Sequence, residues 1–409
     1  MAGEYTEFPQ FRSFAPFCSI ARREEWVASD LNLFLECVMS HASRSVIPLL
    51  VVAACTTEPP TSQTFRPAVS RDIAPAASRT VVMSGLDAPR GLAWGPEGAL
   101  YVAEAGSNVA TGPCVAGGRG SNCYSGTGAV TRLWHGRQER IASGLPSGYN
   151  ATTADIGGPH DISFVGRGNA QVSIGWGGPP ASRAAFGEIG AAFGTLIAVT
   201  PSGNWRVEAD IAAFEGENNP AGGILESNPY GILAEPEARY VTDAGGNSLL
   251  RVRPNGDVSL VATFAAIPVP RGPFNPPFAQ SDPVPTEVTR GPDGALYVST
   301  LTGAPFLPGA AAIYRVVPGQ APQMYVGGLT QIVDFDWAAD GSLYVVQYAS
   351  APFLGGPGSV IRISPNGNRS TITADLFHPT AVLAGPDGAI YVSNKGSQPS
   401  VGEVLRIVP

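Results

Sequence analysis

Acidic residues recur at matching places along this chain, close to the starts and ends of short apolar segments. Aligning the repeated segments places one carboxylate of five successive repeats at the same rim, either at the start of the first strand or at the end of the second: Glu104, Asp161, Asp243, Glu287 and Asp334. Carboxylate oxygens are preferred ligands of hard cations such as calcium, and the amides of Gln347 and Asn394 could complete a coordination shell. The sequence therefore predicts a calcium site formed by these five acids. Alternatively, each acid accepts backbone hydrogen bonds at a strand end, as Asp and Glu near glycine commonly do.

Two histidines lie in the same segments as the acids. His160 directly precedes Asp161, and His378 directly precedes Pro379. Imidazole titrates near neutral pH, so either histidine could carry a proton in lactone opening or phenol oxidation. We assign His160, Asp161 and Glu287 as candidate catalytic residues. The alternative for each histidine, which stands beside a proline at a strand entrance, is a hydrogen bond to the backbone.

The aligned positions also suggest ligand-binding side chains. The candidates are Arg90, Tyr230, His378 and Asn394. Tyr230 and Trp176 could stack on a planar ligand, or could pack between neighbouring repeats. The chain has no nucleophile elbow, no phosphate-binding glycine loop before a helix and no HExxH. Motifs alone therefore name no reaction.

Six copies of one pattern position these residues. The clearest are PRGLAWGPEGALYVAEAG (89–106), PTEVTRGPDGALYVSTLTG (285–303), VDFDWAADGSLYVVQYAS (333–350) and PTAVLAGPDGAIYVSNKGS (379–397), with worn copies at 159–178 and 229–247. Each copy is followed by a third apolar strand, and all but the last by a fourth. Alternating apolar residues between Gly, Pro and Asp turns are typical of antiparallel hairpins. One such unit cannot bury its apolar face alone, so the units must pack together.

The last copy lacks its fourth strand, and the segment RTVVMSGL (79–86) can supply it from the other end of the domain. Closure of this kind removes the unpaired edge that would otherwise promote aggregation. We predict an all-β fold, a six-bladed β-propeller with four-stranded blades of the NHL or SMP30 kind, over residues 79–409. The first strand of each blade lines the central channel, so the aligned side chains meet at one rim. Blades 1 to 3 carry the insertions.

Composition limits the possible partners. The 409 residues include 50 Gly and 38 Pro and are 44% hydrophobic, which suits one large, turn-rich domain. Only 14% are charged and the net charge is -8, which argues against nucleic-acid binding. We expect a monomer that holds a small molecule or a protein partner at the channel rim.

The segment before the propeller carries features of an exported protein. Residues 46–54, VIPLLVVAA, are too few to span a bilayer but suit the apolar core of a secretory signal. The sequence VAAC (52–55) resembles a bacterial lipobox, with Cys55 as the lipidated residue. We predict an upstream extension (1–38), a signal peptide (39–55) and a flexible linker (56–78), with a lipid anchor as the only membrane contact. The alternative is a plain secretory signal in which Cys55 is incidental.

Cysteine usage agrees with export. Beyond residue 55 the only cysteines are Cys114 and Cys123, both in the insertion GPCVAGGRGSNCYSG (112–126). A pair of this kind in an oxidising compartment predicts a disulfide that clamps the loop. A metal site would need more ligands nearby.

The propeller region as a whole resembles the ScyD/ScyE family, whose name comes from scytonemin biosynthesis in cyanobacteria. The resemblance rests on the cysteine loop and NCYSGTGAVTRL (122–133), GGPHDISF (157–164), ENNPAGGILESNPYGIL (217–233), DAGGNSLLRV (243–252), VPTEVTRGPDGALYV (284–298) and AAIYRVVPG (311–319). It implies an exported propeller, with founding members assigned to late extracytoplasmic steps in making an indole-phenol pigment. Because folds carry over better than reactions, the substrate does not follow.

Two functions stay open at this point. One is an enzyme for oxidative coupling or lactonase-like hydrolysis of an aromatic or cyclic metabolite, with His160, Asp161 and Glu287 near the chemistry. The other is a non-catalytic module that holds a ligand or protein at the rim. In either case we expect a periplasmic or cell-surface lipoprotein.

Overall fold

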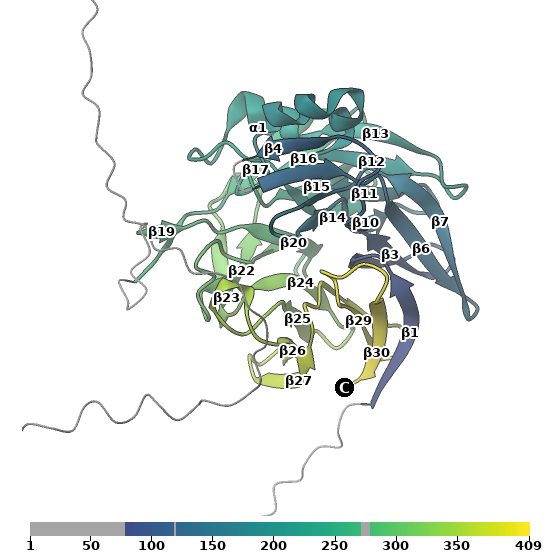
Figure 1. Ribbon diagram of the computed structural model, residues 1–409. Helices are drawn as coiled ribbons and strands as arrows, with labels where there is room; N and C mark the ends of the chain where they lie inside the picture. The colour runs from purple at the N-terminus through teal and green to yellow at the C-terminus, as the bar shows by residue number, and fades with distance from the viewer. Residues whose placement is uncertain (1–77, 118–119, 271–278) are drawn as a thin grey trace, which may run out of the picture. The chain divides into compact units, whose positions relative to one another are not determined.

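The computed structural model describes residues 78–117, 120–270 and 279–409. The predicted upstream extension, the signal peptide with Cys55 and the linker up to residue 77 lie outside these residues. The described residues form seven four-stranded antiparallel sheets, of which six are successive blades and the seventh is formed by insertions within and after blade 1. The predicted six-bladed propeller is therefore confirmed, and Figure 1 views it close to its axis.

The first three blades contain most of the inserted structure. Blade 1 is β2 (Pro89–Trp94), β3 (Leu100–Glu104), β6 (Gly128–Trp134) and β7 (Arg137–Leu145). Blade 2 is β10 (Pro159–Phe164), β11 (Ala170–Ile174), β12 (Thr195–Val199) and β13 (Trp205–Asp210). Blade 3 is β14 (Pro229–Glu235), β15 (Ala238–Asp243), β16 (Ser248–Val252) and β17 (Val258–Thr263).

The last three blades are more compact. Blade 4 is β20 (Pro285–Arg290), β21 (Leu296–Thr300), β22 (Ala311–Val316) and β23 (Gln323–Leu329). Blade 5 is β24 (Ile332–Trp337), β25 (Leu343–Gln347), β26 (Gly358–Ile363) and β27 (Arg369–Leu376). Blade 6 is β28 (Ala381–Ala384), β29 (Ile390–Asn394), β30 (Gly402–Val408) and, from the other end of the domain, β1 (Ser78–Leu86).

The innermost strands form a closed ring. Each of β2, β10, β14, β20, β24 and β28 contacts the next, and β28 returns to β2. In Figure 1 the labelled innermost strands β10, β14, β20 and β24 lie around the middle of the domain, whereas β7, β13 and β27 lie at its periphery. The innermost strands begin at one rim, here called the upper rim, where the second strands also end. The hairpins between first and second strands lie at the lower rim.

Apolar side chains fill the spaces between blades rather than one central core. Each pair of neighbouring blades shares a cluster of buried residues, including the pair formed by blades 6 and 1. Second strands such as β3, β11 and β21 are buried along their whole length because neighbouring blades cover both faces. This arrangement explains their continuous apolar runs. The hairpins that lead into them turn at Gly98, Gly294, Gly341 and Gly388, with φ between 76° and 85°.

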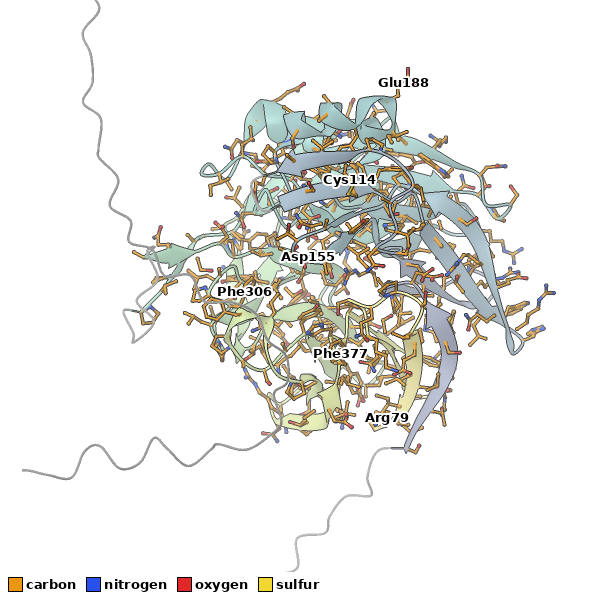
Figure 2. All side chains as sticks on the ribbon, in the orientation of Figure 1. Arg79, Cys114, Asp155, Glu188, Phe306 and Phe377 are labelled. Carbon is orange, nitrogen blue, oxygen red and sulfur yellow. A yellow bond between two sulfur atoms is a disulfide. The ribbon has the colours of Figure 1, made fainter. Side chains whose placement is uncertain are left out.

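Several further helices and short strands lie outside the four-stranded blades. Strands β4 (Cys114–Gly117), β5 (Gly120–Tyr124), β8 (Gly148–Asn150) and β9 (Ile156–Gly157) form an extra sheet, in which Cys114 and Cys123 are disulfide-bonded as predicted (Figure 2). Blade 2 carries η1 (Pro180–Ala192), and α1 (Ile211–Asn218) follows it. The short strands β18 (Ile267–Pro268) and β19 (Gln280–Ser281) lie between blades 3 and 4, and η2 (Pro352–Leu354) lies in blade 5. No helix in the described part of the chain is long and apolar enough to cross a membrane.

Strand β1 closes the ring by pairing with β30 from Ser78 opposite Val408 to Leu86 opposite Gly402. Leu86 is fully buried between blades 6 and 1, whereas Val81 on the same strand is 54% exposed. We expect Leu86→Ala to lower the free energy of unfolding by about 2–5 kcal/mol, because it leaves a cavity at the closure. Urea denaturation followed by circular dichroism measures this.

The matched control is Val81→Ala, for which we expect a loss below about 1 kcal/mol. If the two variants lower the free energy of unfolding equally, burial of Leu86 between blades 6 and 1 does not stabilise the closure.

Candidate functional site

At the upper rim, side chains from three alternate blades bond to the first carbonyl of the next blade. These bonds are His160 Nδ1 with Pro229 O (3.0 Å), Thr286 Oγ1 to Ile332 O (3.0 Å) and Thr380 Oγ1 to Pro89 O (2.7 Å). A carbonyl can only accept, so Nδ1 of His160 carries the hydrogen and Nε2 keeps its lone pair. The backbone bond proposed for His160 as an alternative is therefore present, and it fixes the tautomer of the ring.

One residue deeper, the structure brings Asp161, Glu287 and Asp334 together. They occupy the same register position of β10, β20 and β24, and each acts electrostatically on at least one of the others. The same position in the other blades holds only Gly91, Gly231 and Ala381. A side chain at Gly91 would overlap Asp161, and one at Gly231 would lie 2.9 Å from Oε2 of Glu287. Small residues therefore make room for the three acids.

These acids also satisfy backbone groups of the next blade. Asp161 Oδ2 accepts from the N–H of Ile232 (2.8 Å), and Asp334 Oδ2 accepts from the N–H of Val382 (2.9 Å). The two bonds are equivalent by position, because each runs to the acid from the residue that follows the aligned position (Gly231 or Ala381) in the next innermost strand. The acids thus hold blade 2 to blade 3 and blade 5 to blade 6.

Burial makes these carboxyls weak acids. It raises the pKa of Asp161 to about 7, while hydrogen bonds from the Ile232 and Ile162 backbone and from Glu287 oppose the rise. Burial, followed by the charge of Asp161, raises the pKa of Glu287 and of Asp334 well above the usual range. The group therefore takes up protons more readily than ordinary carboxyls, and a protonated member can donate as well as accept hydrogen bonds.

A fourth acid, Asp336, extends the group along β24. Its Oδ2 accepts from Ala384 N (2.8 Å), and burial raises its pKa to about 6. The sequence analysis missed it, although the alternation of a strand places residues 334 and 336 on the same face. The two-residue spacing of Asp334 and Asp336 could therefore have identified Asp336 from the sequence.

Glu104 does not belong to this group, contrary to the prediction. Its buried carboxylate forms an ion pair with Arg140 (2.5 Å) and accepts from the N–H of Asp87 (2.6 Å) and the hydroxyl of Thr131. All these partners lie in blade 1 or in the segment that leads into it. The physical reason is a cation within the same blade, which fixes the carboxylate away from the other acids.

Asp243 is likewise engaged elsewhere. Its Oδ1 accepts from the N–H groups of Asn228 (2.6 Å), Gly245 (3.1 Å) and Gly246 (3.0 Å), and its Oδ2 accepts from Ser227 Oγ (2.7 Å). It caps the turn between β15 and β16, as the alternative reading proposed. Among the described residues, no group of three or more His, Cys, Asp or Glu side chains could hold a metal ion. The structure therefore does not bring the five predicted acids together at one calcium site.

Above the acids, four rings lie within electrostatic reach of the Arg90 guanidinium. His160 and Tyr230 have ring centroids 4.8 Å apart, and Tyr348 and His378 are stacked at 4.4 Å with 14° between their planes. The charge of Arg90 acts on all four rings. We call these five residues the mouth cluster. The sequence analysis missed Tyr348, which lies one residue beyond the strand end at Gln347.

Arg90 itself is held by the insertion of blade 1. Its Nη2 donates to the carbonyl of Ile156 (2.9 Å), and its buried Nε has no partner among the described residues. Asp155, next to Ile156, lies near the middle of the ring in Figure 2 and acts on Tyr348 as a negative charge. The guanidinium therefore keeps an unused donor at the mouth.

The two histidines of the mouth cluster differ in their setting. Burial, and to a smaller extent Arg90, lowers the pKa of His160 to about 3, so its ring is neutral at physiological pH. Its ring fills the space beside Gly175. His378 is half-buried, bonds Ser397 Oγ through Nδ1 (2.6 Å), and has a pKa lowered by burial. His160 is thus a neutral base with a free Nε2.

Two other predicted ligand-binding residues, Asn394 and Trp176, form contacts within the protein. Asn394 accepts from Phe377 N (3.0 Å) and donates to Glu403 (2.8 Å), which uses both ends of its amide. Its predicted role in ligand binding is therefore corrected to a structural one. Trp176 donates to Pro179 O (3.0 Å) and packs against Phe186 and Phe193, as the packing alternative stated.

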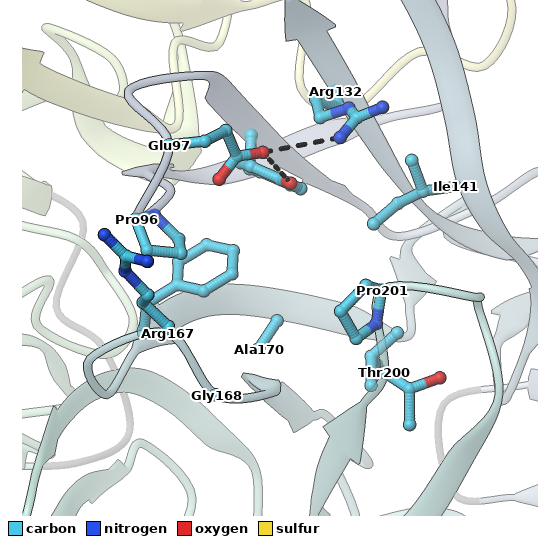
Figure 3. A pocket seen from close by; sticks show the side chains of 12 residues that line it. Pro96, Glu97, Arg132, Ile141, Arg167, Gly168, Ala170, Thr200 and Pro201 are labelled. Atoms are coloured by element: carbon cyan, nitrogen blue, oxygen red, sulfur yellow. Dashed lines mark hydrogen bonds and ion pairs between the residues drawn. The ribbon is translucent and has the colours of Figure 1, made fainter.

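A cavity of about 170 Å³ lies elsewhere, at the lower rim between blades 1 and 2 (Figure 3). Its lining includes Glu97, Arg132, Phe164 and Arg167. Glu97 accepts from Tyr101 (2.5 Å) and pairs with Arg132 (3.4 Å), as the dashed lines in Figure 3 show. The hairpins that carry it are at the opposite ends of the strands from His160, so this cavity is separate from the mouth cluster.

No protein-family model matches the chain, and no curated protein matches it in sequence. Similar solved structures include a virginiamycin B lyase from Staphylococcus aureus (13% identity, TM-score 0.46, covering 81% of this chain and 99% of that one). A gluconolactonase from Xanthomonas campestris is 10% identical, with a TM-score of 0.47 and coverage of 81% and 89%. The calcium-binding protein regucalcin from Agrobacterium tumefaciens is 12% identical, with a TM-score of 0.46 and coverage of 81% and 95%.

The raised pKa values of the channel acids have a measurable consequence. An acid that binds its proton more tightly in the folded chain stabilises the fold at low pH and loses that contribution as pH rises through its folded pKa. We expect Glu287→Gln to flatten the fall in the free energy of unfolding as the pH rises above the ordinary pKa of a glutamate, by up to about 1.4 kcal/mol per pH unit for one proton. Urea titrations across this range measure the slope.

Asp257→Asn, which alters a side chain that is 62% exposed, is the control and should leave the slope as in the wild type. A Glu287→Gln slope equal to that of the wild type would mean that the channel acids are ionised.

Proposed function

We propose that this protein binds a small planar molecule, with an aromatic ring and an anionic or phenolic group, at the mouth cluster of the upper rim. The observation that carries the proposal is Arg90, a cation with an unused buried donor among four rings. Rings offer stacking surfaces to a planar ligand, and a guanidinium is suited to a carboxylate or phenolate.

The acids beneath the mouth support the same ligand class. Because burial raises the pKa values of Glu287 and Asp334 well above the usual range, these two carboxyls take up protons more readily than ordinary acids. Protonated carboxyls donate hydrogen bonds to oxygen atoms of a ligand and do not repel an anion. The resemblance to the ScyD/ScyE family supports the choice of an aromatic ligand.

Acid–base catalysis at the same place is a second candidate, and one observation favours it. The bond from Nδ1 of His160 to Pro229 O leaves Nε2 as a neutral base, while Glu287 below can give a proton. In a lactonase-like reaction, Nε2 would take a proton from an attacking water and the acid would protonate the leaving alkoxide, so that one C–O bond forms and another breaks. The pKa of about 3 makes His160 a weak base, which ranks binding first.

We further propose that the protein acts outside the cytoplasm as a lipoprotein. The Cys114–Cys123 disulfide supports this, because disulfides persist in oxidising compartments and are rare in the cytosol. The VAAC sequence ending at Cys55 supports a lipid anchor.

The binding proposal is tested with indole-3-acetate and 4-hydroxyphenylacetate as probes, titrated into the protein in a calorimeter. We expect Arg90→Gln to weaken probe binding by about 10- to 100-fold, because a charge-assisted hydrogen bond is lost. The amide analogue of each probe should bind the wild type more weakly than the acid.

Arg167→Gln, at the cavity of the lower rim, is the matched control and should bind both probes like the wild type. If Arg167→Gln weakens binding and Arg90→Gln does not, the ligand site lies at the lower rim instead. Turnover of a lactone that is abolished by His160→Gln while probe affinity is kept would establish the second candidate.

The anchor is tested by expressing the full chain in a Gram-negative host with labelled palmitate. We expect label in the membrane fraction for the wild type and none for Cys55→Ser, because the thiol is the acylated group. Labelling of Cys55→Ser, or a wild type without label, would contradict the anchor.

A further inference from the structure

A second group of buried acids lies outside the channel, where α1 packs at the boundary between blades 2 and 3. The buried residues of α1 are Ile211, Ala212 and Glu215, which share one face of the helix. A glutamate thus occupies a position that the helix pattern reserves for an apolar side chain. Such a local violation is expected at functional or strained sites.

The surroundings of Glu215 leave its charge uncompensated. The side chain is 0% exposed, and both carboxyl oxygens lack a hydrogen-bond partner within the described part of the chain. None of the ion pairs among those residues includes Glu215 or Asp243. A buried carboxylate without partners costs several kcal/mol, so the site must take up either a proton or a cation.

Glu215 and Asp243 converge on the turn between β15 and β16. A β-carbon at Gly246 would lie 2.6 Å from Oε2 of Glu215 and 3.1 Å from Cγ of Asp243. Asp243 is also 0% exposed. Its Oδ1 is saturated by three N–H groups, but Oδ2 accepts only from Ser227 and keeps a lone pair.

The hydroxyl oxygen of Ser248 is an independent sign of a ligand site at this turn. Ser248 lies directly opposite Asp243 in the β15–β16 register, so the two side chains share one face of the sheet. Ser248 is 0% exposed, and its hydroxyl has no partner among the described residues. Unpartnered buried oxygens on two different elements therefore surround the same turn.

We propose that Glu215, Asp243 and Ser248 form a binding site for a hard divalent cation of the calcium class, which fastens α1 to blade 3. Glu215 offers two free oxygens for bidentate coordination, and Asp243 Oδ2 and Ser248 Oγ offer one each. The two carboxylates balance the charge of the ion, and water completes the shell. Bidentate carboxylate and a flexible number of oxygens suit calcium better than magnesium.

The electrostatics of the pair agree with a cation. Burial, followed by the charge of Asp243, raises the pKa of Glu215 to about 7, so the proton that competes for the site is held weakly near neutral pH. A divalent cation that displaces this proton would remove both the repulsion and the unpaired charge. This site is separate from the channel acids Asp161, Glu287 and Asp334.

The test is calorimetric titration of calcium chloride into the chelator-treated full chain at pH about 7.5, with thermal unfolding in the presence of calcium or chelator. We expect one ion per chain and a higher melting temperature with calcium, because an ion that binds the folded state stabilises it. Glu215→Gln should weaken calcium binding by at least about 100-fold and abolish the thermal shift.

Control variants locate the ion. Glu217→Gln, on the exposed side of the same helix, should bind calcium like the wild type. Ser248→Ala, a milder change that provides a result even if Glu215→Gln folds poorly, should weaken binding several-fold without altering the melting temperature in chelator. Absence of calcium binding by the wild type overturns the proposal, as does binding that survives Glu215→Gln but is lost in Glu287→Gln, which would place the ion in the channel.

Discussion

The innermost strand of each blade has one edge without a strand partner, and the rest of the structure depends on how that edge is satisfied. The polar groups of this edge face a channel whose opposite wall belongs to other blades. Side chains of the preceding blade supply the missing bonds: the hydroxyls of Ser173, Thr242 and Ser393 donate to the carbonyls of Tyr230, Thr286 and Arg90. Every such bond crosses a blade boundary. The ring is therefore satisfied only when it is closed, which is the contribution of β1.

The bonds that hold the blades together also prepare the candidate site. The backbone carbonyls of Arg90 and Tyr230 accept hydrogen bonds from the neighbouring blades. The side chains of these two residues therefore extend from a rigid part of the rim. His160 bonds blade 3 through Nδ1, and this structural bond determines which ring nitrogen is free. A functional group on a rigid, over-determined element loses little entropy when it meets a ligand. The same residues thus join neighbouring blades and line the candidate site.

Charge is distributed in layers along the channel. The cation of Arg90 lies at the mouth, and the acids with raised pKa values lie beneath it. Acids with a cation in their own blade, such as Glu104 with Arg140, take no part in this arrangement. Glu215 differs from both groups because neither an arginine nor another acid bonds its oxygens. Its position explains why the cation proposed for this protein belongs beside α1 and not in the channel.

The sequence by itself determined the number of blades, the four-strand unit and the closing strand, because each follows from local patterns that repeat along the chain. It also placed Asp161, Glu287 and Asp334 at equivalent positions. Tertiary structure decided which acids meet, because a repeat alignment fixes the register of a residue but not the partner of its side chain. Glu104 does not join the other acids because it pairs with Arg140, and Asp243 does not because it accepts hydrogen bonds from the backbone N–H groups of Asn228 and Gly246. Glu215 and Tyr348 gain their surroundings only from contacts between segments distant in sequence, and no single repeat contains that information.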